Sequence, residues 1–166
     1  MTEVINYLFD AYATYSAFEI ILESLAFGFG IISVIYAKRE NILVYPTGIT
    51  CTLITMYFMY NERLIGHMMV NLFYTLMSIY GWWNWSRKEN DVVKVKISKF
   101  AFKDFPKATL IFFFIVFISY FSHDYFNTDL GVYANLDIFT SGIFVTAMWL
   151  MANKKLENWV LWIIGN

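Results

Sequence analysis

Residues 18–37 read FEIILESLAFGFGIISVIYA, a run of 20 residues in which Glu19 and Glu23 are the only charged side chains. A helix needs about 20 predominantly apolar residues to cross a bilayer, so this run predicts a membrane-spanning helix. Four further stretches of the chain have the same apolar character, and a sixth begins near Leu156. These four stretches are residues 42–60, 65–85, 107–121 and 134–152.

The composition of the whole chain agrees with a membrane protein. Its 166 residues are 59% hydrophobic and 15% charged, whereas a soluble domain is about 45–50% apolar and about 25% charged. A net charge of −1 gives no basic field for nucleic acid. Cys51 is the one cysteine, and His67 and His123 are scattered, so the sequence predicts neither a disulfide framework nor a metal or other cofactor. We therefore expect a small polytopic membrane protein.

The basic residues are distributed unevenly between the apolar stretches. If the short stretch 107–121 spans the membrane, the connections after the first, third and fifth stretches hold 11 of the 12 Lys and Arg residues, with Lys107 counted in the third stretch's connection. The remaining residue, Arg63, follows the second stretch. Because cytoplasmic loops are enriched in Lys and Arg, we expect these three connections in the cytoplasm and the N-terminus outside.

Two junctions between apolar stretches resemble each other. Residues 38–48 read KRENILVYPTG and residues 155–165 read KLENWVLWIIG, an offset of 117 that aligns Tyr45 with Trp162. Helix-boundary chemistry repeated by chance is one interpretation. The other is a pair of three-helix units in the same orientation, a transporter architecture whose substrate site lies at the repeat interface. The expected organisation is an N-terminal extracytoplasmic segment (1–17), a first three-helix bundle (18–85), a basic cytoplasmic loop (86–106), a linker helix (107–126) and an incomplete second bundle (134–166).

Several polar groups lie inside the apolar stretches. A carboxylate near the bilayer centre costs about 2.5–3.5 kcal/mol on insertion scales, so Glu23 and Asp137 are candidates for a functional role. They could instead lie at the outer interface or pair with neighbouring helices. Asn71 is in the middle of the third stretch, where it could bind a ligand or join two helices by a hydrogen bond.

Tryptophans gather at two places. Residues 81–85 read GWWNW, and because successive helical residues are rotated by about 100°, at least one of these rings should face the bundle interior. Trp159 and Trp162 are spaced i, i+3 on one face, and Asn166 follows at i+4 from Trp162. This face could sandwich a flat polar ring, or it could simply belong to an interfacial aromatic belt.

Three motifs occur together: residues 40–41 (EN) followed by residues 46–48 (PTG), residues 81–85 (GWWNW) and residues 157–162 (ENWVLW). In this combination the chain, from about Glu19 to Asn166, resembles the PnuC family of bacterial vitamin-precursor transporters. The resemblance implies an all-α, SWEET-like 3+1+3 helix arrangement, a homotrimer in the bacterial cytoplasmic (inner) membrane, and a substrate site that includes the Trp-x-x-Trp motif. It also implies facilitated uptake of nicotinamide riboside, which phosphorylation then traps inside the cell.

The resemblance implies seven helices, whereas the sequence ends at Asn166 within the sixth, so we expect a truncated form of a longer chain. Apart from Lys107 at the edge of the fourth stretch, the apolar stretches contain no Lys or Arg to pair with a phosphate, which favours a nucleoside over a nucleotide. A thiamine or riboflavin carrier, or a non-transporting membrane subunit or receptor, remain alternatives; no nucleophile–base spacing indicates an enzyme. The candidate substrate-binding residues are Trp159, Trp162, Asn166, Trp82, Trp85, Asn71, Asp137, Glu23 and Tyr45.

Overall fold

The computed structural model describes residues 15–89, 92–93, 95–125 and 134–166. Most of the expected N-terminal segment and part of the connection after residue 125 lie outside these residues. The described chain is almost entirely helical, with one short hairpin between α4 and α5. The helices are α2 (Ala17–Lys38), α3 (Val44–Asn61), α4 (Ile65–Ser86), α5 (Phe105–Tyr125), α6 (Ala134–Ala152) and α7 (Asn158–Gly165). The other elements are β1 (Lys88–Glu89), β2 (Val92–Val93) and the 3-10 helix η2 (Phe102–Asp104).

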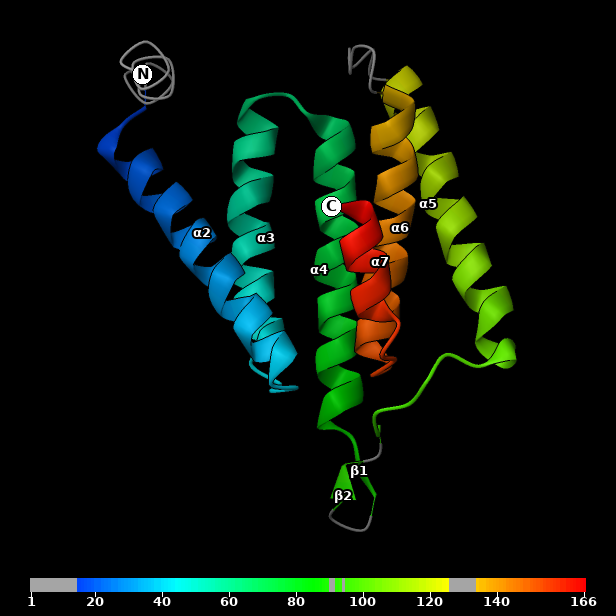
Figure 1. The fold of residues 1–166 in the computed structure, drawn as a ribbon. Helices are drawn as coiled ribbons and strands as arrows, with labels where there is room; N and C mark the ends of the chain where they lie inside the picture. The colour runs from blue at the N-terminus through cyan, green and yellow to red at the C-terminus, as the bar shows by residue number, and fades with distance from the viewer. Residues whose placement is uncertain (1–14, 90–91, 94, 126–133) are drawn as a thin grey trace, which may run out of the picture.

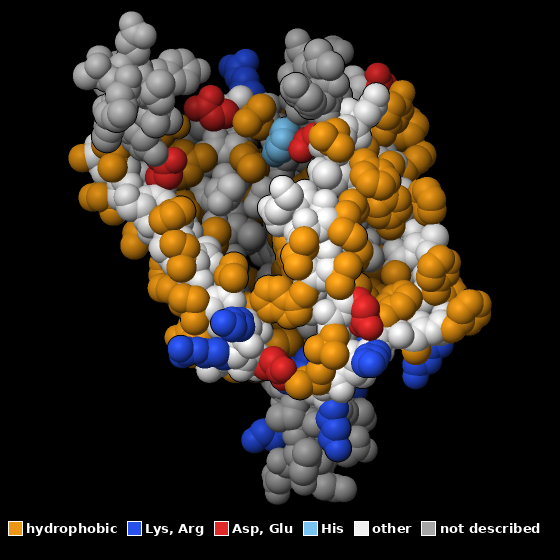
Figure 2. Space-filling model, viewed as in Figure 1, with side chains coloured by type: hydrophobic (Ala, Val, Ile, Leu, Met, Phe, Trp, Pro, Cys, Tyr) orange, Lys and Arg blue, Asp and Glu red, His pale blue; other side chains and the backbone are white. Residues whose placement is uncertain are grey.

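The helices lie side by side, with α2 at one edge of the molecule, α5 at the other, and α4 between them (Figure 1). The connections α2–α3, α4–α5 and α6–α7 all lie at the lower end in this view, which we call the basic end. This arrangement brings the three connections rich in Lys and Arg to one end of the molecule, as the sequence predicts. Apolar side chains cover much of the flanks of α2 and α5 (Figure 2).

Three helices of the described chain are long and apolar enough to cross a membrane: Ala17–Lys38, Phe102–Ser122 and Asn135–Ala152. The helices α3 and α4 have 18 and 22 residues, which corresponds to about 27 and 33 Å. Their length therefore suits a bilayer, but their Thr, Asn and His residues make them less apolar. The helix α3 packs on α2 and α4, and α4 packs on α3 and α6, so the protein shields part of their polar surface from lipid.

Two helix boundaries differ from the sequence-based expectation. The fourth apolar stretch was expected over residues 107–121, but α5 runs from Phe105 to Tyr125 and is therefore long enough for a span. Its start is set by η2, where the Asp104 carboxylate accepts a hydrogen bond from the Ala101 N–H at 3.0 Å. The sixth helix begins at Asn158, two residues after the expected start near Leu156, and the Leu156 N–H before it donates to the Ser98 carbonyl at 3.1 Å.

The α2–α3 and α6–α7 turns share a pattern of backbone hydrogen bonds, in a register that differs from the one that the sequence suggested. Glu40 and Lys154 both have a left-handed φ of 51°, and they are 114 residues apart. The backbone bond from the Asn41 N–H to Tyr36 has its counterpart from Lys155 to Leu150, at 3.0 and 2.9 Å. The other bonds through these two turns repeat with the same offset. In the α2–α3 turn these bonds join Arg39 to Ile35, Glu40 to Ala37, Val44 to Asn41 and Tyr45 to Ile42. In the α6–α7 turn they join Asn153 to Trp149, Lys154 to Met151, Asn158 to Lys155 and Trp159 to Leu156.

The predicted offset of 117 is therefore wrong by three residues. The identical residues that suggested this offset lie at different positions relative to the left-handed residue of each turn. In a short turn, residue identity indicates the register less reliably than the backbone hydrogen bonds do. With an offset of 114, Tyr45 corresponds to Trp159 rather than to Trp162. Gly48 then corresponds to Trp162, and Thr52 corresponds to Asn166.

The tightest apolar packing lies at the basic end, around Tyr45, Val44 and Trp85. The Tyr45 and Trp85 rings meet edge to face with their centroids 5.1 Å apart. Asn84 Nδ2 and Trp85 Nε1 both donate to the Ala152 carbonyl, at 3.0 and 3.1 Å, and so join the end of α4 to the end of α6. A side chain at Gly81 would have no room, because an added Cβ would overlap the Tyr45 ring.

We expect Gly81→Ala to lower the free energy of unfolding by about 1–3 kcal/mol, because overpacking forces a well-packed neighbour to shift. Tyr45 is 1% exposed and has little freedom to do so. Gly28→Ala is the matched control, since an added Cβ there meets nothing within 4 Å and alanine favours a helix by about 0.5–1 kcal/mol. Thermal unfolding of both variants in detergent measures the difference, and equal stabilities would contradict this packing.

Candidate substrate-binding cavity

A cavity of about 460 Å³ lies between α2, α3 and α4 on one side and α6 and α7 on the other. This volume falls in the range of about 300–1,000 Å³ that small-molecule sites occupy. Figure 2 shows the surface hollowed between α2 and α7. The lining residues are Gly30, Ser33, Val34, Ala37, Val44, Gly48, Cys51, Thr52, Tyr74, Ser78, Met148, Met151, Trp159, Trp162, Ile163 and Asn166.

The offset of 114 relates part of the cavity lining. Four of the eight lining residues from α2 and α3 have a lining counterpart 114 positions later, on or just after α6 and α7. The corresponding lining pairs are Val34 and Met148, Ala37 and Met151, Gly48 and Trp162, and Thr52 and Asn166. The two helix pairs thus present the same positions to one shared space. The side chains differ, so the two walls of the cavity have different chemistry.

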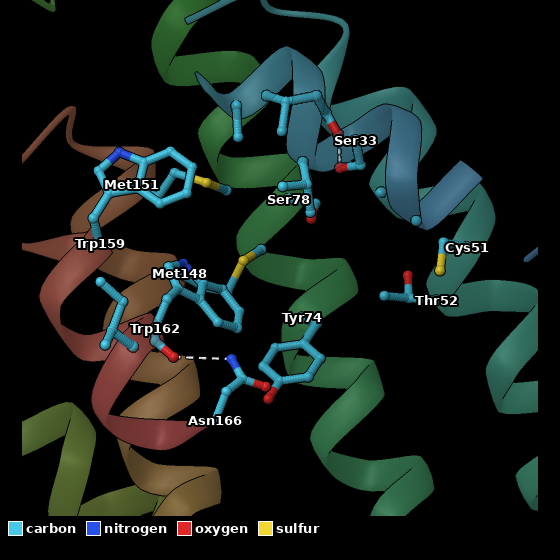
Figure 3. Close-up of a pocket in the computed structure, with 16 residues that line it drawn as sticks. Ser33, Cys51, Thr52, Tyr74, Ser78, Met148, Met151, Trp159, Trp162 and Asn166 are labelled. Atoms are coloured by element: carbon cyan, nitrogen blue, oxygen red, sulfur yellow. Dashed lines mark hydrogen bonds between the residues drawn. The ribbon is translucent and has the colours of Figure 1, made fainter. Parts of the chain in front are cut away.

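One wall is aromatic and comes mainly from α7. Trp159 and Trp162 are spaced i, i+3, so both rings point toward the same space (Figure 3). Trp162 is held from behind by the Phe144 ring, which stacks on it at a centroid distance of 5.4 Å. Asn166 Nδ2 donates to the Trp162 carbonyl at 2.9 Å, and Figure 3 shows this amide beside Tyr74 of α4. The wall therefore offers two indole faces, a phenol and an amide.

The opposite wall carries hydroxyl groups from α2, α3 and α4. Ser33 Oγ donates to the Val44 carbonyl at 3.0 Å, and the Thr52 and Thr75 hydroxyls are 2.8 Å apart. Gly48 lies among these groups, since an added Cβ would be 3.2 Å from Ser33 Oγ and 3.9 Å from Ser78 Oγ. The absence of a side chain at position 48 leaves this hydroxyl cluster open to the cavity. A ligand with both a flat ring and hydroxyl groups matches the two walls.

Among the described residues that line the cavity, none is Lys, Arg, Asp or Glu. The bonding groups are hydroxyls, one amide, the indole N–H groups of the two tryptophans and the Cys51 thiol, which is partly accessible. Such a site can orient a neutral or singly charged ligand by hydrogen bonds and ring contacts, but it offers no counter-ion to a phosphate group.

Three of the nine residues expected to bind substrate line this cavity together: Trp159, Trp162 and Asn166. Tyr45 and Trp85 lie in the packed cluster at the basic end, adjacent to the cavity floor. Trp82 is on the outer surface of α4, where its side chain is exposed.

The remaining three expected residues lie toward the end opposite the basic end. Asn71 Nδ2 donates to the Met59 sulfur at 3.2 Å and to the His67 carbonyl at 3.1 Å, so it joins α4 to α3. Asp137 pairs with His67 at 3.1 Å and joins α6 to α4. Glu23 lies on α2, half-buried and away from the lining.

The hydroxyl wall was not predicted from the sequence. Ser33, Thr52 and Ser78 are ordinary residues for helices that pack together, and no motif marks them. An offset of 114 would have indicated part of this wall, because it aligns Thr52 with Asn166 and Gly48 with Trp162. That register rests on backbone bonds, which the letters alone did not show.

A bundle of membrane-spanning helices with a ligand-sized cavity between two repeated helix pairs is the architecture of a membrane transporter. Residues 20–166 match the model of the family described as nicotinamide mononucleotide transporters, and the chain belongs to this family. The protein is accordingly a multi-pass membrane transporter, not an enzyme.

A solved structure titled as that of the vitamin B3 transporter PnuC has the same fold, with a TM-score of 0.66 and 20% sequence identity. The alignment covers 92% of this chain and 74% of that chain. Among curated proteins, none matches this sequence.

Cys51 offers a direct check on the cavity, because it is the only cysteine in the chain and it lines the space together with Gly48. We expect N-ethylmaleimide to label Cys51, and Gly48→Leu to slow the labelling several-fold by filling the cavity one turn away. Gly28→Leu is the control, because a side chain there meets nothing within 4 Å. Labelling of Gly48→Leu at the rate of the unmodified chain would show that the two residues do not share a cavity.

Proposed function

We propose that this protein carries nicotinamide riboside across the bacterial inner membrane by facilitated diffusion, and that phosphorylation inside the cell retains the product. The observation that supports this substrate is a cavity with an aromatic wall, Trp159 and Trp162, opposite a hydroxyl wall. Nicotinamide riboside combines a flat pyridinium ring with a carboxamide and a ribose. The two ends of the molecule therefore match the two walls.

The pyridinium ring suits the indole faces of α7. A cation over an aromatic face gains roughly 0.5–2 kcal/mol, depending on how well it is shielded from water. The amide of Asn166 can donate to and accept from the carboxamide, and the Ser33 and Ser78 hydroxyls can do the same for the ribose. Each contact is moderate, so the site would bind the ligand without trapping it.

The family description names the mononucleotide, but the lining favours the nucleoside. A phosphate carries up to two negative charges, and burying them without a cation costs several kcal/mol. Among the described residues that line the cavity, none is Lys or Arg. The riboside lacks this phosphate and keeps its positive ring, which the aromatic wall accommodates.

The acidic residues Asp137 and Glu23 lie at the end of the molecule away from the basic end, where they fit a role on the path to the cavity. The Asp137 side chain, paired with His67, is 40% exposed, and Glu23 lies on the neighbouring edge of the molecule. Negative charge near an opening concentrates a cationic ligand. We propose that these residues, with Asn71 between them and the cavity, guide the ligand inward rather than hold it.

The proposed topology follows from the charge distribution. The basic end would face the cytoplasm and the N-terminus the outside, because Lys and Arg accumulate in cytoplasmic loops. Transport would occur by rocking of two three-helix units about the cavity, in a 3+1+3 arrangement with α5 as the linker helix. The apolar outer faces of α2 and α5 would then contact lipid or the neighbouring protomers of a homotrimer.

Thiamine is the strongest alternative substrate, because it is also a flat cation with a hydroxyl group. Riboflavin is a further alternative, with a larger neutral ring system. A non-transporting membrane subunit would need no ligand in the cavity. Binding of each vitamin separates these possibilities.

We expect nicotinamide riboside to slow maleimide labelling of Cys51, and Trp159→Ala or Trp162→Ala to weaken this protection. The loss of one cation–aromatic contact should raise the Kd by roughly 2- to 30-fold, equivalent to about 0.5–2 kcal/mol. Trp159→Phe and Trp162→Phe are matched controls that keep a ring and should lose less.

Thiamine and riboflavin are tested in the same assay. Protection by either of them, but not by nicotinamide riboside, would reassign the substrate. If none of the three protects Cys51, the transport proposal for this cavity fails.

A further inference from the structure

The connection between α4 and α5 is bound to the start of α7 by a set of contacts that the proposed function does not use. We call this set the clamp. It joins Ser98, Phe100 and Asp104 of the connection to Lys155 and Glu157 of the α6–α7 turn.

The backbone part of the clamp is a short parallel bridge. The Ser98 N–H donates to the Lys154 carbonyl at 3.0 Å, and the Leu156 N–H donates to the Ser98 carbonyl at 3.1 Å. These two bonds hold the connection alongside the turn immediately before α7.

The side-chain part of the clamp is charged and largely shielded from solvent. Lys155 Nζ lies 2.7 Å from the Asp104 carboxylate, and the two side chains are 11% and 15% exposed. Lys155 Nζ also donates to the Lys99 carbonyl at 3.3 Å. The Glu157 carboxylate accepts a hydrogen bond from the Phe100 N–H at 2.7 Å. Charge-assisted bonds of this length are stronger than neutral ones, and shielding reduces their screening by salt.

The repeat shows that the turn does not need these charges to form. In the first helix pair, Asn41 occupies the position of Lys155 and Leu43 that of Glu157. There the Asn41 side chain accepts a hydrogen bond from the Leu43 N–H at 3.0 Å, within the turn itself. The same backbone turn therefore forms with a local contact, and the charged residues of the second turn have another role.

The helix that the clamp holds is the one that carries the aromatic wall. The described packing of α7 is mainly on α6, through the stack of Trp162 on Phe144. Glu157 lies two residues before Trp159, so the clamp acts on the first turn of α7 and sets where this ring lies opposite the hydroxyl wall.

We propose that Asp104, Lys155 and Glu157 are positioning residues that hold α7 so that Trp159 and Trp162 face the cavity, and that they thereby set the affinity for the ligand. The ligand part of this inference rests on the proposed function. The clamp gives α5 and its preceding connection control over the site, although none of the three residues lines the cavity.

The test uses the full chain in detergent, with nicotinamide riboside followed by calorimetric titration. Asp104→Asn and Lys155→Gln should each raise the Kd roughly tenfold, since small displacements of binding groups are costly. The number of binding sites per chain should stay the same. The exchanged pair, Asp104→Lys with Lys155→Asp, should restore most of the affinity. Glu157→Gln keeps an acceptor oxygen for the Phe100 N–H and should lose less than Glu157→Ala.

A merely structural role gives a different result. Misfolded protein lowers the number of sites and leaves the Kd of the remaining folded protein unchanged. Lys107→Asn is the control for loss of one basic charge, because this lysine is exposed in the first turn of α5. An unchanged Kd in Asp104→Asn, or no recovery in the exchanged pair, would overturn the inference.

A second readout needs no ligand. Release of α7 should open the cavity and speed maleimide labelling of Cys51 in Asp104→Asn, and the exchanged pair should reverse this. If the unmodified chain does not bind nicotinamide riboside, the proposed function fails, and the labelling rates still decide the clamp. Equal labelling rates in all variants would overturn it.

Discussion

The Ala152 carbonyl, which accepts hydrogen bonds from Asn84 and Trp85, is the contact on which the arrangement of the two helix pairs depends. It lies in the last turn of α6, where helix carbonyls lack intrahelical partners. The two donors come from the last turn of α4, so the bonds fix these helix ends against each other. Tyr45 of α3 packs on Trp85 and brings the first helix pair to the same point. The cavity lies above this junction, and its width follows from how the two pairs diverge from it.

The same backbone turn, used twice, produces a cavity with unlike walls. The two pairs match over the turns and place corresponding residues in the shared space, as with Gly48 and Trp162. Because only the side chains differ, one copy supplies rings and the other supplies room and hydroxyl groups. If the first helix pair also carried indole rings at these positions, the rings of the two pairs would fill the cavity. Gly48, the counterpart of Trp162, has no side chain and therefore leaves a volume in which a flat ring can stack on Trp162.

The sequence predicted the membrane class, the helices and the common end of the basic connections, because these depend on apolar runs and charge counts. It also predicted that Trp159, Trp162 and Asn166 act together, because helical spacing places them on one face. It did not predict the register in which the α2–α3 and α6–α7 turns correspond, because that register appears in the backbone hydrogen bonds and not in the identical residues. The hydroxyl wall escaped prediction for a related reason. Serine and threonine are common in packed membrane helices, and only the fold shows that these residues line a cavity opposite α7.

The composition of the cavity is suited to a carrier that must release what it binds. A carboxylate at this depth would attract a cationic ring strongly, but it would also have to be left unpaired each time the ligand departs, at a cost of several kcal/mol. Indole faces and hydroxyl groups need no such compensation, because they remain solvated by water or by each other when the site is empty. Binding then comes from several moderate contacts whose geometry matters more than their charge. Where each contact is weak, affinity depends on how accurately the helix that bears the rings is held, and this is the role that we propose for the clamp.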